Sequence, residues 1–324
     1  MATVKDPIGL FDRFNSAAAL MVTPEWTVLK ANRSNPKAGR VECRPTNFSM
    51  KPDMRTIGGT RVRIAEGGRE AGPTVLLLCP LPQSILCFDP IWNSLANHFH
   101  LVALDLPGFG RSDGGVEFMN FKAQGEYLDK FVNEMELENV HILGPDVGMP
   151  AALYYATHFD HRAASLIVGD GPGIAPSSNG SIIEKMVKSG FWRTVFKITG
   201  HRTFVEAGYR LGCLHYRPSA EEVSDYTESY CGRVGTICSN WFKNYDENIA
   251  QVDPYLDKLE VPVQIFWGDR DVFLLEENAH RLGKRLPKSR VTIFDNCGHF
   301  SYQDKHQDFA AMVIDWVNGT YEKV

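Results

Sequence analysis

Short apolar runs that alternate with amphipathic stretches are the dominant pattern of this chain from residue 61 onward. Alternating apolar and polar positions over 61–65 predict an edge strand. The other runs are nearly continuous, which is typical of parallel strands covered on both faces; they lie at 74–79, 101–105, 140–143, 164–168, 263–267 and 291–294. Apolar residues at helical spacing predict helices between them, at 91–96, 121–135, 149–156 and 304–317. This alternation indicates an α/β protein with a mostly parallel, doubly wound sheet.

One long stretch interrupts the alternation. From about residue 171 to 248 the sequence predicts no strand, only helical segments that are punctuated by Gly and Pro and are rich in aromatic side chains. The stretch begins at the glycine-rich segment 169–173, directly after a predicted strand. We therefore expect an inserted helical cap at 172–248, and a core formed by 56–171 and 249–324.

The first 55 residues differ from the rest of the chain. They predict only weak helices, near 6–20 and 23–32, and they hold too few apolar residues for a core of their own. We expect residues 1–55 to form an arm that packs on the surface of the core.

Composition narrows the classes of partner. The chain has 324 residues, 44% of them hydrophobic, with a net charge of −5 and no basic run. These values predict neither nucleic acid nor an anionic membrane as a partner. The apolar runs are too short to span a bilayer, and the N-terminus lacks the layout of a signal peptide. We expect a cytoplasmic protein, whose seven scattered cysteines are free and buried.

The segment Gly144-Pro145-Asp146-Val147-Gly148 carries the most specific chemical signal. It follows the predicted strand 140–143 and has the G-x-Nuc-x-G pattern of a nucleophile elbow, with an aspartate where a serine usually stands. A carboxylate is ionised at pH 7 and suits attack on an sp3 carbon that carries a leaving group. The pattern predicts Asp146 as a nucleophile. The alternative is a surface aspartate at a helix N-terminus, where negative charge is favoured.

Further motifs follow other predicted strands, at 79–82, 105–113, 268–271 and 297–300. Nucleophile, acid and histidine occur in this chain in the order found in α/β-hydrolases. Residues 58–320 resemble that family, and the aspartate elbow with a helical cap resembles its epoxide hydrolase and hydrolytic dehalogenase branch. The resemblance implies the α/β-hydrolase fold, an eight-stranded, mostly parallel sheet flanked by helices, with an inserted helical cap.

The resemblance also implies roles for individual residues. The nucleophile forms an alkyl-enzyme ester, and His299 activates the water that cleaves it. Asp271, in G-x-x-D after a strand, matches the acid that orients the imidazole, and Asp170, at the end of the preceding strand, is the alternative acid. The backbone N–H groups of Leu81 and Val147 are expected to hold the oxyanion.

The nature of the leaving group distinguishes the candidate reactions. Haloalkane dehalogenases carry a halide-binding tryptophan where this chain has Val147, and 79–82 replaces the H-G-x-P motif of the family. The segment 147–150 has no cation that could hold a substrate carboxylate. We therefore expect an apolar, aromatic pocket and favour a neutral epoxide as substrate. The alternatives are a dehalogenase, an esterase, lyase or cyclase, and a binding protein without catalysis.

Several cap residues are candidates for the pocket and for the leaving-group donor. Phe242 falls where the family has an acid tyrosine. Trp192 and Trp241 each carry an indole N–H, with cap packing as the alternative role. A neighbouring tyrosine could supply the proton instead: Tyr209, Tyr216, Tyr230 or Tyr245.

The sequence contains few features that indicate a cofactor or an oligomeric state. The chain has no dinucleotide or phosphate loop and no ligand spacing typical of a metal site, so we expect neither a cofactor nor a metal. The expected partners are a small neutral organic substrate and water as co-substrate. Formation of a homodimer stays open.

Overall fold

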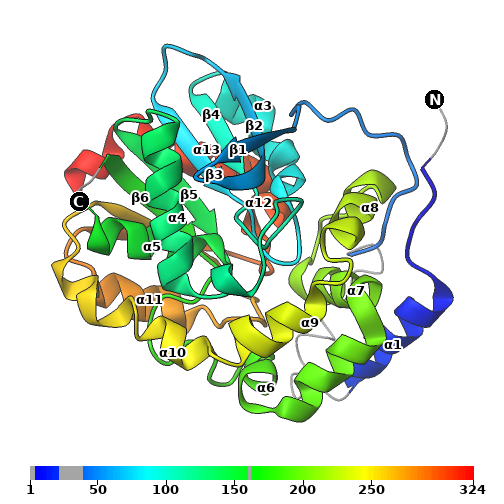
Figure 1. The fold of residues 1–324 in the computed structure, drawn as a ribbon. Helices are drawn as coiled ribbons and strands as arrows, with labels where there is room; N and C mark the ends of the chain where they lie inside the picture. Colours follow the sequence, from blue (N-terminus) through cyan, green and yellow to red (C-terminus); the bar gives the residue numbers. More distant parts are fainter. Residues whose placement is uncertain (1–3, 22–38, 160–161) are drawn as a thin grey trace.

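A computed structural model describes residues 4–21, 39–159 and 162–324. In this part of the chain, eight strands form one sheet in the order β1-β2-β4-β3-β5-β6-β7-β8 (Figure 1). Only β1 with β2 and β2 with β4 pair antiparallel, and the other neighbours are parallel. The predicted fold class is therefore confirmed. The strands are β1 (Asp53–Ile57), β2 (Thr60–Gly68), β3 (Thr74–Leu78), β4 (His100–Leu104), β5 (Val140–Pro145), β6 (Ala163–Gly169), β7 (Val263–Gly268) and β8 (Ser289–Phe294).

Helices cover both faces of this sheet, which explains the continuous apolar runs. Residues 75–78 of β3, for example, are fully buried. Helix α4 packs beside α5 on one face, and α3 packs beside α13 on the other (Figure 1). The flanking helices are α3 (Asp89–Ala96), α4 (Phe121–Glu134), α5 (Gly148–His158), α11 (Glu277–Arg285) and α13 (His306–Val317).

Between β6 and β7 the described chain forms helices and turns but no strand. We call this part, residues 172–248, the insertion. It is irregular: Gly200, with φ of 85° and ψ of 177°, kinks α7, and residues 237–242 form a π-helix. Its elements are α6 (Ile183–Lys188), α7 (Gly190–Gly212), α8 (Ala220–Ser229), α9 (Val234–Thr236), η3 (Ile237–Phe242) and the start of α10 (Tyr245–Ile249).

The N-terminal residues contact the insertion as well as the core. Helix α1 (Leu10–Met21) packs against α7, where Arg13 lies 3.7 Å from Glu206. The backbone of Glu42 exchanges hydrogen bonds of 2.8 Å with Pro218 and Ala220. The expectation of an arm on the core alone was too narrow, since α1 lies on the insertion (Figure 1). The helix predicted at 23–32 lies outside the described residues.

Two smaller expectations need correction. The helix predicted at 304–317 is broken at Lys305, whose φ of −126° and ψ of 38° are not helical, so a short α12 (Ser301–Asp304) precedes α13. All seven cysteines are free, but Cys43 and Cys231 are exposed. In the described part of the chain, no helix combines the length and the apolar character needed to cross a membrane.

Candidate active site

The turn after β5 places Asp146 at the carboxyl end of the sheet. Its φ of 48° lies in the left-handed region, which a non-glycine residue adopts at a cost. The flanking glycines permit this tight turn: a Cβ on Gly144 would lie 2.5 Å from the carbonyl oxygen of Gly148, and a Cβ on Gly148 would lie 2.9 Å from Leu78. The sequence thus builds a strand–turn–helix that presents one carboxylate.

The structure brings three predicted residues together. The Nε2 atom of His299, in the loop after β8, lies 3.3 Å from Oδ2 of Asp146. Its Nδ1 atom lies 2.8 Å from Oδ2 of Asp271, which follows β7. The other oxygen of Asp271 accepts the N–H groups of Phe273 and Leu274, at 2.8 and 3.2 Å. Three parallel strands end at the same edge of the sheet, so residues 153 positions apart meet.

The imidazole lies between two carboxylates, and this controls its charge. Burial by itself lowers the pKa of His299, but the charge of Asp271 and the hydrogen bonds with Asp146 and Asp271 raise that pKa well above its ordinary value. The two carboxylates therefore favour the protonated form of the imidazole that lies between them.

Asp170, the alternative acid, occupies a neighbouring buried position. Its carboxylate accepts hydrogen bonds from the Ser301 hydroxyl at 2.7 Å and from the Gly268 N–H at 3.3 Å. Burial and the charge of Asp271 raise the pKa of Asp170 well above its ordinary value. Of the two acids, only Asp271 is hydrogen-bonded to the imidazole of His299.

One of the two expected oxyanion donors contacts the elbow carboxylate directly. The N–H of Leu81 donates to Oδ1 of Asp146 at 2.8 Å. Val147, which supplies the second expected donor, is buried and lines the same pocket. Oδ1 is thus held by a backbone N–H, whereas Oδ2 faces the imidazole.

A pocket between the core and the insertion contains this carboxylate. Its charged lining groups are Asp146 and His299, and none of its described lining residues is Lys or Arg. Most of the wall is apolar or aromatic, and it includes Ile182, Met186, Phe196, Phe204, Leu211 and Phe273. Within the described ranges, no group of three or more His, Cys, Asp or Glu side chains is arranged to hold a metal ion.

The predicted cap residues divide into two groups. Trp241 and Phe242 line the pocket, and the Trp241 ring packs edge-on against Phe109, at a centroid distance of 5.2 Å. Trp192 is absent from the described lining. It is half-buried, and the ammonium group of Lys185 lies 5.5 Å from its ring centroid. Its assignment to the pocket is corrected, because it contributes to packing within the insertion.

Three of the candidate tyrosines are also absent from the described pocket lining. Their hydroxyls are engaged elsewhere: Tyr209 accepts a hydrogen bond from Gln83 at 3.1 Å, and Tyr216 donates to Glu222 at 2.7 Å. The hydroxyl of Tyr230 donates to the carbonyl of Gln83 at 2.8 Å. The structure therefore does not bring these three hydroxyls to the described pocket lining, and they hydrogen-bond to groups around and within the insertion.

Tyr245 is the candidate tyrosine that does line the pocket. Its hydroxyl is buried and has no hydrogen-bond partner among the described residues. Burial and the charges of Asp146 and Asp271 raise the pKa of Tyr245 well above its ordinary value, so the O–H keeps its proton. A buried hydroxyl without a partner costs about 1–3 kcal/mol. The Tyr245 hydroxyl thus has an unused hydrogen-bonding capacity among the described residues.

Sequence reasoning missed Asp304. Its buried carboxylate accepts four backbone N–H groups, three of them from residues 214–216 at 2.7 to 2.8 Å and one from Gly298 at 3.0 Å. It thereby fastens the loop that carries His299 to the segment after α7. The sequence around Asp304 does not predict this contact, because most of its partners are about 90 positions away.

Comparison with known proteins agrees with the observed fold. A family model described as the alpha/beta hydrolase fold matches residues 73–193. The monoacylglycerol lipase ABHD6 of Bos taurus is 23% identical over 263 residues, which cover 76% of this chain and 75% of that protein. The solved epoxide hydrolase CorEH superposes with a TM-score of 0.70 at 20% identity, over 83% of this chain and 99% of that chain.

The haloalkane dehalogenase DbeA from Bradyrhizobium elkani superposes with a TM-score of 0.72 at 19% identity, over 85% of this chain and 99% of that chain. The chain is therefore an α/β-hydrolase-fold protein. The resemblance predicted from its motifs is confirmed for the fold, and its structural neighbours include an epoxide hydrolase and haloalkane dehalogenases.

Proposed function

We propose that this protein hydrolyses neutral, apolar epoxides through a covalent ester on Asp146. One observation carries the proposal: a pocket that contains an elbow carboxylate paired with His299 is also lined by Tyr245, whose buried O–H has no hydrogen-bond partner in the described part of the chain. The carboxylate can open the ring, and the hydroxyl of Tyr245 can donate a proton to the alkoxide that forms.

In the first step, Oδ2 of Asp146 attacks an epoxide carbon and the carbon–oxygen bond of the ring breaks. The alkoxide takes the proton of Tyr245. The tyrosinate then regains a proton from the imidazolium of His299, which leaves a neutral imidazole. The products of this step are an alkyl ester on Asp146 and a free hydroxyl on the neighbouring carbon.

In the second step, neutral His299 removes a proton from water, and the hydroxide attacks the ester carbonyl of Asp146. The N–H groups of Leu81 and Val147 stabilise the tetrahedral oxyanion. Collapse breaks the bond between the carbonyl carbon and the alkyl oxygen, and that oxygen takes the proton from His299. The diol leaves, and the acid form of Asp146 returns its proton to the imidazole.

The pocket supports a neutral substrate. A charged group buried in this cavity would need a partner of opposite charge. The described lining offers no cation besides the imidazolium of His299, which is already held by two carboxylates. Apolar surface dominates the wall, so the burial of hydrocarbon provides most of the binding energy.

A second candidate is hydrolytic dehalogenation, which the presence of Trp241 in the pocket favours. An indole N–H can stabilise a departing halide. Attack on an acyl carbon, the chemistry implied by the name of the lipase relative, suits a hydroxyl nucleophile better than a carboxylate.

The test is to trap the ester. In a His299→Gln variant, incubation with a panel of apolar epoxides is expected to add the mass of one epoxide to the protein, on the peptide that contains Asp146. The wild-type protein is expected to release diols. The Asp146→Ala variant is the control and should show neither adduct nor turnover. Halide release from haloalkanes without epoxide turnover would favour the second candidate, and ligand-induced stabilisation without turnover would indicate a binding protein.

A further inference from the structure

A buried ionic cluster joins the insertion to the core next to the loop that carries Leu81. The guanidinium of Arg63, on β2, donates to both oxygens of Asp225 at 2.9 Å. It also lies 3.7 Å from Asp105, which follows β4. Asp225 belongs to α8 of the insertion. Asp105 is fully buried, and the side chains of Arg63 and Asp225 are only 11% and 15% exposed.

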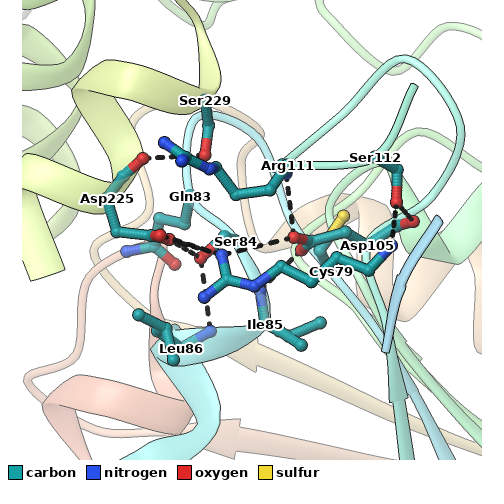
Figure 2. A network of polar contacts seen from close by, with 12 residues as sticks. Cys79, Gln83, Ser84, Ile85, Leu86, Asp105, Arg111, Ser112, Asp225 and Ser229 are labelled. Atoms are coloured by element: carbon teal, nitrogen blue, oxygen red, sulfur yellow. Dashed lines mark hydrogen bonds and ion pairs between the residues drawn. The ribbon is translucent and has the colours of Figure 1, made fainter. Parts of the chain in front are cut away.

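The cluster contacts the loop directly. Figure 2 shows Ser84 between Asp225 and Asp105. The hydroxyl of Ser84 donates to Asp225 at 2.5 Å, and the N–H of Ile85 donates to Asp105 at 2.7 Å. Ser84 is only three residues after Leu81, so the loop is held by one acid from the insertion and one from the core.

A second contact fastens the same loop. The hydroxyl of Tyr230, just after α8, donates to the carbonyl of Gln83 at 2.8 Å and accepts the N–H of Gly110 at 3.3 Å. Two consecutive loop residues, Gln83 and Ser84, are therefore held by groups of the insertion. A shift of α8 would displace both.

We propose that Asp225 is a positioning residue, which acts through Ser84 to keep the N–H of Leu81 on Oδ1 of Asp146. The proposal rests on the ester mechanism above. The carboxylate of Asp225 is held from two sides, because Nη1 of Arg63 donates to both of its oxygens and the hydroxyl of Ser84 donates to one of them. Buried charges of this kind require all their partners, so the loss of one rearranges the rest.

The step that should respond is hydrolysis of the ester. The Leu81 N–H serves the tetrahedral oxyanion, and removal of one such donor costs about 10²–10³ in rate. Displacement of the donor, with the N–H still present, is expected to cost roughly 10-fold. Formation of the ester, in which charge leaves Asp146, depends less on this donor. The alkyl-enzyme should therefore accumulate.

The chain offers a matched control for this experiment. Glu228 lies on the same helix α8 and pairs with the side chain of Arg111 at 2.5 Å. That pair also links the insertion to the core, but Glu228 is exposed, and its side-chain hydrogen bonds in the described structure go to Arg111 and Ser224 and not to residues 81–85. Asp225→Asn and Glu228→Gln each remove one negative charge and one ion pair from the same helix.

The experiment measures ester formation and ester hydrolysis by rapid-quench mass spectrometry in a single turnover. We expect hydrolysis about 10-fold slower in Asp225→Asn and unchanged in Glu228→Gln. Ser84→Ala should also slow hydrolysis, and the double variant Asp225→Asn/Ser84→Ala should be no slower than the slower single variant. Wild-type hydrolysis rates in Asp225→Asn, or equal losses in both α8 variants, would overturn the proposal.

A second readout does not depend on the reaction. Leu81 follows Pro80 in the one Pro-Leu pair of the sequence, so carbonyl-13C proline and 15N-leucine labelling selects its amide resonance. We expect this resonance to move in Asp225→Asn and to stay in place in Glu228→Gln. If the wild type forms no ester, the proposed function fails while this comparison still decides the role of Asp225. An unmoved resonance in Asp225→Asn overturns it.

Discussion

The N–H of Leu81 donates a hydrogen bond of 2.8 Å to Oδ1 of Asp146 and so assigns different roles to the two oxygens of one carboxylate. In the proposed mechanism, Oδ1 is the oxygen that becomes the oxyanion when water attacks the ester. Oδ2 lies 3.3 Å from Nε2 of His299, and in the proposed mechanism it is the oxygen that bonds to substrate carbon.

The origin of the oxygen atoms in the product follows from this division. In a single turnover in H₂¹⁸O, the label is expected in the carboxylate of Asp146, because water attacks the ester carbonyl. The diol should be unlabelled in the first turnover and labelled only in later ones. Mass spectrometry of the peptide and of the diol measures both. Label in the first diol would show direct attack of water on the substrate.

The pH dependence of the two steps should differ. The pKa of His299 is raised in the free protein partly by Asp146. Ester formation removes that charge, so the pKa falls when a neutral base is needed. The imidazole is protonated below its pKa, and hydrolysis of a preformed ester should therefore decline only at lower pH than the titration of His299 in the free protein. NMR titration and single-turnover hydrolysis give the two values, and equal values would contradict the mechanism.

Removal of the Tyr245 hydroxyl should separate activity from stability. Tyr245→Phe is expected to slow epoxide opening about 10²–10³-fold, because the alkoxide loses its proton donor. Stability should be unchanged or slightly higher, since the hydroxyl has no described partner. Tyr216→Phe should show the opposite, with normal turnover and a loss of about 1 kcal/mol from its bond to Glu222. Steady-state kinetics and denaturant unfolding test both, and full activity in Tyr245→Phe would exclude it as the donor.

The two buried acids should contribute unequally. Asp271→Asn removes the charge that stabilises the imidazolium and is expected to slow turnover by about 10³–10⁴. Asp170→Asn keeps the shape of a side chain bonded to Ser301 and Gly268, and should leave turnover within a few-fold of wild type. Turnover measured for both variants decides the assignment. Greater loss in Asp170→Asn would reverse it.

The carboxylate of Asp304 should be important for stability. Asp304→Ala leaves four buried N–H groups without their acceptor, which is expected to cost about 3 kcal/mol or more. Asp295→Ala, at an exposed acid that also follows β8, should change stability by less than about 0.5 kcal/mol. Urea unfolding measures both, and similar values in the two variants would show that this junction contributes little.

The sequence predicted the sheet and the triad for the same physical reason. Buried parallel strands are continuous apolar runs, and the residues just after them converge at one edge of the sheet. Asp146, His299 and Asp271 each follow such a run, so their meeting could be expected. Their positions predicted that these side chains lie near one another, whereas the choice of Asp271 over Asp170, which also follows a predicted strand, came from the family resemblance.

The side-chain positions within the insertion could not be predicted from the sequence pattern. Its helical phase is lost at the Gly200 kink and at the π-helix 237–242, so spacing could not show which tyrosine faces the carboxylate. Asp225 and Asp304 were missed because their partners lie between about 80 and 160 positions away. Contacts between residues so far apart produce no periodic pattern in the sequence.

The backbone pairing of Glu42 with Pro218 and Ala220 has a consequence for engineering. Residues before the sheet begins complete the hydrogen bonding of a segment that comes some 175 positions later. A chimera that exchanged residues 172–248 alone with a homologue would separate the two sides of this backbone pairing, because Glu42 would come from one protein and Pro218 and Ala220 from the other. We therefore expect that a redesign of specificity by exchange of the insertion should also exchange the N-terminal segment that contains Glu42.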